Sequence, residues 1–176
     1  VVGSKTSLFN AVNGVAYGAD ISGTMMWVAV GTPFIGSVYG STAYSIAYSY
    51  NMTTWTGILN VGNFTGQGNH VAYGQDENGN GIWVAVGQRD GVSPTTDICG
   101  NYLMGASSTT LFYSYDGIRW IASSGTGVFA AAGNDVSWGL DASGVSTWVA
   151  TGVGYTNTST GAYIAGGQIS YSQNGR

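Results

Sequence analysis

Hydrophobic residues along this chain fall into short runs separated by glycine, asparagine, serine and aspartate. The stretch from Leu111 to Trp120 shows the pattern most clearly. Apolar and aromatic residues lead into Ser114, and Asp116-Gly117 is one of the strongest short signals for a hairpin turn. The apolar residues do not recur at helical spacing, so the pattern predicts short strands joined by tight turns. We expect an all-β fold.

Three sequence landmarks recur in the same order along the chain. The first is Val-Ala-Tyr-Gly or a close variant, the second is Trp-Val-Ala-Val-Gly or a close variant, and the third is a Tyr-Ser phrase followed by a turn. Successive copies of the first two landmarks are 56 and then 65 residues apart. The copies begin at Val15, Val71 and Val136, at Trp27, Trp83 and Trp148, and at Tyr48, Tyr113 and Tyr171.

Each repeat predicts four short strands, the last of which opens with the Trp of the turn. Repeats of this length with four strands each are typical of β-propeller blades. We therefore expect three blades, at residues 11–62, 63–127 and 128–176. Residues 1–10 would supply a strand that completes another blade, and the third blade would lack its last strand. The propeller would be part of a larger chain or of an oligomer.

The turn phrase of the second repeat resembles a known motif. Ser114-Tyr-Asp116-Gly117-Ile-Arg-Trp120 is similar to the Asp-box of the bacterial-neuraminidase-repeat proteins, with one residue fewer between Asp and Gly. Sialidases, sortilin-type receptors and photosystem assembly factors carry such boxes on propeller blades. The resemblance implies a structural turn between the third and fourth strands, not an activity. Its expected residues are Ser114, Asp116, Gly117 and Trp120, then Ser49, Asn51 and Trp55, with Met52 in place of Gly, and finally Ser172, Asn174 and Gly175.

The composition limits the classes of partner. Charged residues make up 7% of the chain and the net charge is -4, so no basic surface is available for nucleic acid. No apolar stretch is long enough to span a membrane. Ser, Thr, Asn, Tyr and 30 Gly residues supply the polarity instead, which suits an extracellular or surface-exposed protein. Three sequons, at Asn51, Asn63 and Asn157, permit glycosylation on a secretory route.

Residues that could carry catalysis are few and scattered. A sialidase needs three clustered arginines and a Tyr-Glu pair, whereas Arg89, Arg119 and Arg176 lie in no matching motif. His70 is the only histidine, so we interpret it as a hydrogen-bonded link residue rather than a catalytic or metal-binding one. Cys99 is also alone and is interpreted as a packed thiol. We expect no catalytic residue and no bound organic cofactor.

One local motif resembles a cation-binding loop. Asp76, Asn78 and Asn80 place oxygen-bearing side chains at alternate positions before Gly81, an arrangement that suits Ca²⁺. The distal bidentate Glu of a calcium loop is missing, because Gly87 stands at that position. A plain hairpin turn explains the same residues and is the interpretation we favour over a calcium site.

These observations favour a non-enzymatic structural or binding repeat protein of a surface, filament or virion-type assembly, with glycans as one class of ligand. The alternatives are a fragment of a glycan-active propeller enzyme, such as a sialidase or another glycosidase, and a protein-binding receptor propeller. The expected partners are other copies of the chain or the rest of a longer chain. We expect Val1 to Ser7 to pair with the strand at Ile169 to Ser172 of such a partner.

Overall fold

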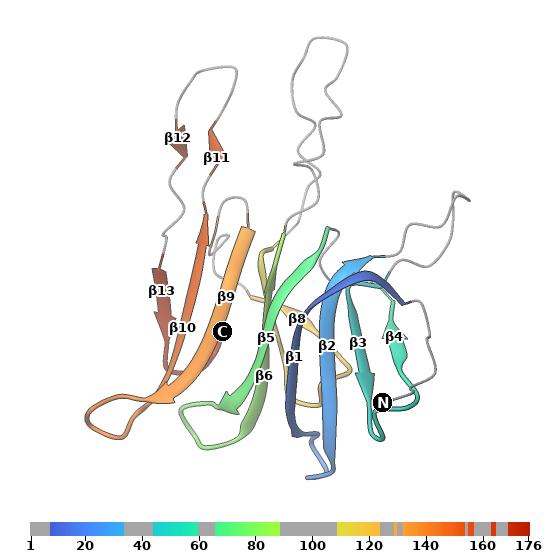
Figure 1. Cartoon of the computed structure of the whole chain (residues 1–176). Coiled ribbons are helices and arrows are strands. Elements are labelled where there is room, and N and C mark those ends of the chain that lie inside the picture. The colour runs from blue at the N-terminus through green and yellow to red at the C-terminus, as the bar shows by residue number, and fades with distance from the viewer. Residues whose placement is uncertain are drawn as a thin grey trace.

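The computed structural model describes residues 8–33, 44–59, 66–88, 109–123, 129, 132–153, 155–156, 163–164 and 169–176. Throughout these residues the fold is all-β and contains no helix. The strands form three antiparallel sheets of three or four strands and one two-stranded ribbon, and the three larger sheets stand side by side in chain order (Figure 1). The predicted all-β class is therefore confirmed. The described residues form no closed ring of sheets.

The first two sheets contain four strands each, and every strand pairs with the next one along the chain. The first sheet consists of β1 (Phe9–Ala19), β2 (Met25–Pro33), β3 (Ile46–Ser49) and β4 (Thr56–Ile58). The second consists of β5 (Gly68–Gln75), β6 (Gly81–Gly87), β7 (Leu111–Ser114) and β8 (Ile121–Ala122). This is the strand order that the repeat predicts.

The third sheet has three strands, in the order β9 (Ala132–Leu140), β10 (Ser146–Val153) and β13 (Ile169–Ser172). Between β10 and β13 the chain adds a two-stranded ribbon of β11 (Tyr155–Thr156) and β12 (Tyr163–Ile164), which the sequence did not predict. Among the described residues, β13 pairs only with β10. Val1 to Ser7 lies outside the described residues, so its pairing with β13 stays a prediction.

The hairpins that open the three sheets have the same construction and lie at the same end of the molecule (Figure 1). In each, the backbone N–H of a glycine donates to the carbonyl oxygen of the aspartate three residues earlier, at 2.9–3.0 Å. These glycines have φ between 77° and 83°, a left-handed conformation that glycine adopts without steric cost. The pairs are Asp20 with Gly23, Asp76 with Gly79, and Asp141 with Gly144.

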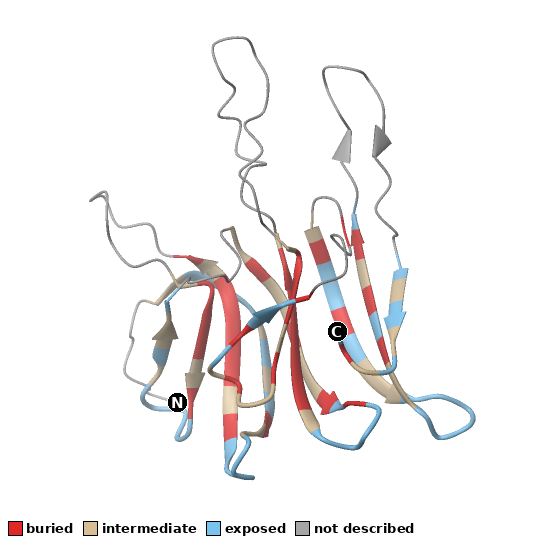
Figure 2. Cartoon of the chain, turned by 180° about the vertical axis from the view of Figure 1, so that it is seen from behind, coloured by how far each residue is buried: buried red, intermediate tan, exposed pale blue. Residues whose placement is uncertain are grey.

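Buried residues form two clusters, one between the first and second sheets and one between the second and third (Figure 2). The middle sheet contributes to both, and its strand β6 is buried along almost its whole length. This burial on both faces is what the uninterrupted apolar run Trp83 to Val86 predicts. The first strands of the sheets, β1, β5 and β9, pack against one another in series.

Candidate functional site

The turn between β7 and β8 is held by hydrogen bonds from within its own sequence. Ser114 Oγ accepts the backbone N–H of Gly117 at 2.9 Å and donates to Asp116 Oδ1 at 3.0 Å. The same Asp116 oxygen accepts the backbone N–H groups of Ile118 at 2.8 Å and Arg119 at 2.6 Å. Gly117 has φ of 71°. The carboxylate is therefore engaged in closing the turn.

Trp120 anchors this turn in the core. Its Nε1 donates to the carbonyl oxygen of Gly117 at 3.2 Å, and its ring is buried in the cluster between the first and second sheets. Met26 and Val28 of the first sheet belong to the same cluster. The turn thus ties a surface loop to the contact between two sheets. What this arrangement does is fold the chain, because its polar groups are bonded to its own backbone.

The first copy of the turn keeps these bonds although its residues differ. Asn51 Oδ1 accepts the backbone N–H groups of Thr53 at 3.0 Å and Thr54 at 2.8 Å. Ser49 Oγ accepts the N–H of Met52 at 2.9 Å. Met52 has φ of 62° and is the only residue other than glycine with a positive φ in the described part of the chain. An amide oxygen therefore serves as well as a carboxylate here, and a left-handed methionine is tolerated.

The third copy shows the same start of the turn. Ser172 Oγ donates to Asn174 Oδ1 at 2.7 Å, and Asn174 Oδ1 accepts the backbone N–H of Arg176 at 3.0 Å. Gly175 has φ of 71°, the same value as Gly117. In all three copies the serine hydroxyl bonds the Asp or Asn oxygen and the residue in the glycine position has a positive φ, although Met52 is exposed and Gly117 and Gly175 are buried. The relation of these turns to the Asp-box family stays a prediction.

The candidate calcium loop is a closed hairpin turn. Asp76 is 2% exposed, and its Oδ1 accepts the backbone N–H groups of Asn78 and Asn80, both at 2.9 Å. The Asn80 side chain faces the carboxylate with its nitrogen, with Nδ2 3.2 Å from Asp76 Oδ2. In the third sheet, Asp141 Oδ1 accepts the corresponding N–H groups of Ser143 and Val145. Asn80 thus donates to the Asp76 carboxylate, and the calcium site stays a prediction.

The environment of Asp76 favours its ionised form. Burial raises the pKa of this carboxyl group, but hydrogen bonds from Asn80 and Asn78 outweigh the burial and hold the pKa below its ordinary value. The positive charge of Arg176 acts in the same direction. In the first sheet, hydrogen bonding by Ser22, and also by Tyr50, lowers the pKa of Asp20.

Of the other singled-out residues, His70 joins two sheets. Its Nδ1 lies 2.9 Å from Asp135 Oδ1 and 3.1 Å from the carbonyl oxygen of Val136, both on β9. The expected hydrogen bonding of His70 is present, but His70 lies within β5 and not in a link before the strand. Arg89 and Cys99 lie outside the described residues. Within the ranges that the structure describes, no three His, Cys, Asp or Glu side chains gather as metal ligands would.

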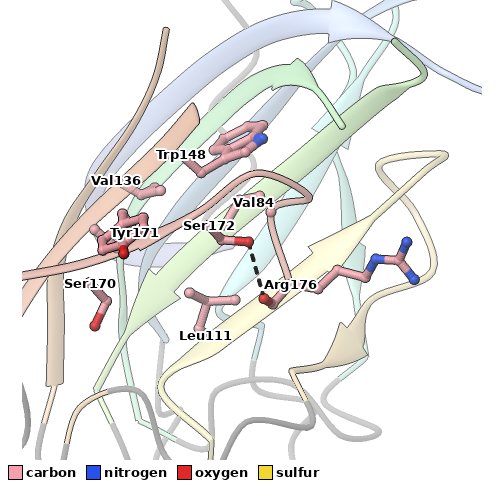
Figure 3. Close-up of a pocket in the computed structure, with 10 residues that line it drawn as sticks. Val84, Leu111, Val136, Trp148, Ser170, Tyr171, Ser172 and Arg176 are labelled. Carbon is pink, nitrogen blue, oxygen red and sulfur yellow. Dashed lines mark hydrogen bonds between the residues drawn. The ribbon is translucent and has the colours of Figure 1, made fainter. Parts of the chain in front are cut away.

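A cavity of about 290 Å³ opens between the second and third sheets (Figure 3). It is lined by Val84 and Leu111 on one side and by Val136, Trp148 and Ala150 on the other. The lining is completed by Ser170, Tyr171, Ser172, Gly175 and Arg176, and Arg176 is its only charged residue.

Comparison of the repeats explains this cavity. Between the first and second sheets, the large side chains of Phe112 and Trp120 fill the corresponding space. In the third repeat Ser170 stands where the second has Phe112. The cavity is therefore the place that a Phe fills in the preceding repeat. It is a packing gap rather than a site built around polar groups.

The contacts between neighbouring sheets repeat, and the sequence analysis did not find them. Trp83 Nε1 donates to the carbonyl oxygen of Ala19 at 3.0 Å, and Trp148 Nε1 donates to that of Gln75 at 2.8 Å. The acceptor Gln75 lies 56 residues after Ala19, and the donor Trp148 lies 65 residues after Trp83. These are the same steps that separate the landmarks of the sequence repeat. Each Trp therefore ties its sheet to the end of the first strand of the preceding sheet.

Two asparagines make a second repeated link. Asn13 Nδ2 donates to the carbonyl oxygen of Gly68 at 2.9 Å, and Asn69 Nδ2 donates to that of Gly133 at 2.7 Å. The signal was present in the sequence, because Asn13, Asn69 and Asn134 follow the same steps as the landmarks. It was missed because a polar residue in a strand suggests solvent exposure when its partner is unknown.

Comparison of the chain with protein-family models, with characterised proteins and with solved structures found no match. No helix in the described residues is both long enough and apolar enough to cross a lipid bilayer.

Proposed function

We propose that this chain is a non-enzymatic repeat protein whose three sheets are β-propeller blades carrying Asp-box-like turns. In this proposal it is a structural or binding component of an extracellular or surface-exposed assembly. The observation that carries the proposal is the repeated contact between sheets. The indole N–H of Trp83 bonds the end of β1 in the first sheet, and the indole N–H of Trp148 bonds the end of β5 in the second sheet. The same geometric step therefore relates the first sheet to the second and the second to the third. Repetition of such a step around an axis is how propellers are built.

The placement of the titratable groups supports a role without chemistry. Asp20, Asp76, Asp116 and Asp141 each use one carboxylate oxygen to accept backbone N–H groups in a turn. Catalysis requires polar groups that converge on a substrate. These four aspartates of the described residues instead each close a separate turn. The cavity between the second and third sheets is lined by more apolar than polar side chains, and its lining contains one charged residue, Arg176. This distribution favours folding and packing over acid–base work.

Low charge and a surface rich in small polar residues favour association with similar surfaces or with glycans. The partners we propose are other copies of the chain or further blades, with glycans as the small-molecule class. Neither a metal nor an organic cofactor has a part in this proposal.

Two measurements test the proposal. A panel of chromogenic glycosides and sialosides should show no turnover above buffer, and turnover that tracks the purified chain would overturn the non-enzymatic role. The blade arrangement is tested by Gly74→Val. A Cβ atom at Gly74 would come within 2.2 Å of the Trp138 ring of the next sheet, so this variant should unfold at clearly lower denaturant concentration. An unchanged midpoint would contradict the stacking of the sheets.

A further inference from the structure

The two outer faces of the row of sheets carry complementary features. Tyr73 of the second sheet packs on Gly18 of the first, where an added Cβ would lie 2.2 Å from its ring. Trp138 of the third sheet packs in the same way on Gly74 of the second. The next glycine in this series is Gly139, and no atom lies within 4 Å of the place where its Cβ would be. Gly139 thus leaves room on the third sheet for an aromatic ring to pack, and we call such a glycine position a seat.

The first sheet presents the matching ring. Tyr17 occupies the position of Tyr73 and Trp138 in the repeat, and it is 49% exposed. Its ring lies against Trp27 with the centroids 4.6 Å apart. Tyr73 and Trp83 form the equivalent pair at 4.7 Å, where they meet the preceding sheet. The aromatic pair of the first sheet therefore has nearly the same ring separation as the pair that the second sheet uses for packing, with a smaller tilt of 37° against 55°.

The polar partners on the outer faces match as well. The series of indole bonds to Ala19 and Gln75 continues at the carbonyl oxygen of Leu140, at the end of β9. In the series of asparagine bonds, the next donor is Asn134, which is exposed, and the next acceptor would be the carbonyl oxygen of Val12 on a following sheet.

Apolar residues on the two outer faces are more exposed than their counterparts between the sheets. Val71 and Val136 are each 1% exposed between sheets, whereas their counterpart Val15 on the outer face of the first sheet is 52% exposed. On the opposite outer face Ile169 is 70% exposed, although its counterpart Ile46 is fully buried. Both faces therefore leave uncovered those apolar positions that a neighbouring sheet covers elsewhere. Exposed apolar patches of this kind mark interaction sites.

We propose that the outer face of the first sheet docks on the outer face of the third sheet of a second copy of this chain, head to tail. In this contact Tyr17 sits on Gly139 of the second copy, and Trp27 Nε1 donates to the carbonyl oxygen of Leu140. The inference rests on the proposed blade arrangement. Two copies with three blades each give six blades, which lies within the range of about four to eight found in propellers. The proposed assembly is a closed dimer in which the contact occurs twice.

The contact is heterologous, since different faces meet, and the repeated step between sheets closes it into a ring. An isologous dimer would use one face twice and leave the other uncovered. This difference makes the two faces separately testable.

The experiment measures the mass of the purified chain by light scattering and analytical ultracentrifugation at a series of concentrations. The wild type should have twice the 18.1 kDa mass of one chain. Gly139→Val fills the seat without touching its own chain and should give a folded monomer. Each blocked contact should weaken association by at least about tenfold, and by about a hundredfold in a dimer with two contacts. Ile21→Ser is the control, because Ile21 is exposed and so are its counterparts Glu77 and Ala142.

Mixing distinguishes head-to-tail contact from other dimers. Tyr17→Asp and Gly139→Val each damage one face and should be monomeric alone, while the mixture should recover dimer through its one intact contact. A wild type that stays monomeric at about 100 µM, a mass above two chains, or a Gly139→Val variant that remains dimeric would overturn the inference. If the wild type is monomeric and Gly74→Val destabilises it, the proposed stacking of the three sheets is retained and only the docking of a second copy is refuted. If Gly74→Val has no effect, the blade arrangement itself has failed.

Discussion

Substitution of Asp116 tests whether the turns of this chain are held by an acceptor oxygen rather than by a charge. Asp116→Ala removes the oxygen that accepts the backbone N–H groups of Ile118 and Arg119, at 2.8 and 2.6 Å. A typical hydrogen bond contributes about 0.5–1.5 kcal/mol net, and water partly replaces the acceptor for the exposed Arg119 N–H. We therefore expect a loss of about 1–2 kcal/mol.

The matched variant is Asp116→Asn, because the chain itself uses asparagine at this position twice. Asn51 accepts two backbone N–H groups in the first turn, and Asn174 accepts one in the third. Asp116→Asn keeps the acceptor and removes the charge, so it should cost less than about 0.5 kcal/mol, as surface changes that preserve their contacts usually do.

Urea denaturation followed by tryptophan fluorescence gives both free energies, and thermal melts provide a second measurement. A loss of about 1–2 kcal/mol in a chain of this size corresponds to a fall in melting temperature of about 2–8 °C. Equal losses in the two variants would refute the argument, because the charge and not the acceptor geometry would then hold the turn.

Four further predictions follow from the same structure. Trp120→Ala should lower the free energy of unfolding, measured by urea denaturation, by about 3–5 kcal/mol, because Trp120 is buried between two sheets. Trp55→Ala should lower it less, because Trp55 is partly exposed. Equal losses would contradict the packing. Gly117→Ala should cost about 1–2 kcal/mol, because its φ of 71° is unfavourable for a residue with a Cβ, and Met52→Gly should not lower the melting temperature; a large loss in Met52→Gly would show that its side chain packs. The folded-state pKa of Asp76 lies below its ordinary value of 3.8. The ionised carboxylate therefore stabilises the fold above pH 3.8, and this effect is lost as the pH falls through 3.8 toward the folded-state pKa. In that pH range the melting temperature of Asp76→Asn should fall less steeply with pH than that of the wild type, and parallel curves would contradict this. Thermal melts with Ca²⁺ and with a chelator should coincide, because hydrogen bonds already occupy the Asp76 carboxylate; a rise in melting temperature with Ca²⁺ would restore the metal site.

The strand order within each sheet could be predicted because it depends on local signals. Turn chemistry at Asp20, Asp76 and Asp141, and the recurring Trp-Val-Ala-Val run, fix where strands end and which neighbours pair. The lengths of the strands were less predictable. The sequence suggested a first strand at Val15 to Gly18, but β1 begins at Phe9 and continues through two irregularities in its pairing with β2. Polar residues such as Asn13 hide this extension, because their partners lie on the next sheet.

The contacts between sheets could not be predicted because each depends on the distance and tilt of a second sheet. Gly18 and Gly74 are ordinary strand glycines in the sequence, and their role as seats for aromatic rings becomes visible only when the sheets are stacked. The cavity beside Trp148 was missed for the same reason. It arises from the small size of Ser170 where the preceding repeat has Phe112, and side-chain volume matters only when the facing residues are known.

Some positions stay the same in all three repeats and others vary. Trp27, Trp83 and Trp148 are identical, and the last two use an indole N–H to bind backbone of the preceding sheet. The serines that open the turns are also identical, and each of them accepts a backbone N–H group. Apolar positions differ among themselves: Val15, Val71 and Val136 are identical, whereas the series Ala47, Phe112 and Ser170 varies. A bond to backbone demands one geometry, whereas an apolar contact tolerates repacking. The repeat is therefore maintained at the residues that set the distance between sheets, which is the quantity a stack of sheets must hold constant.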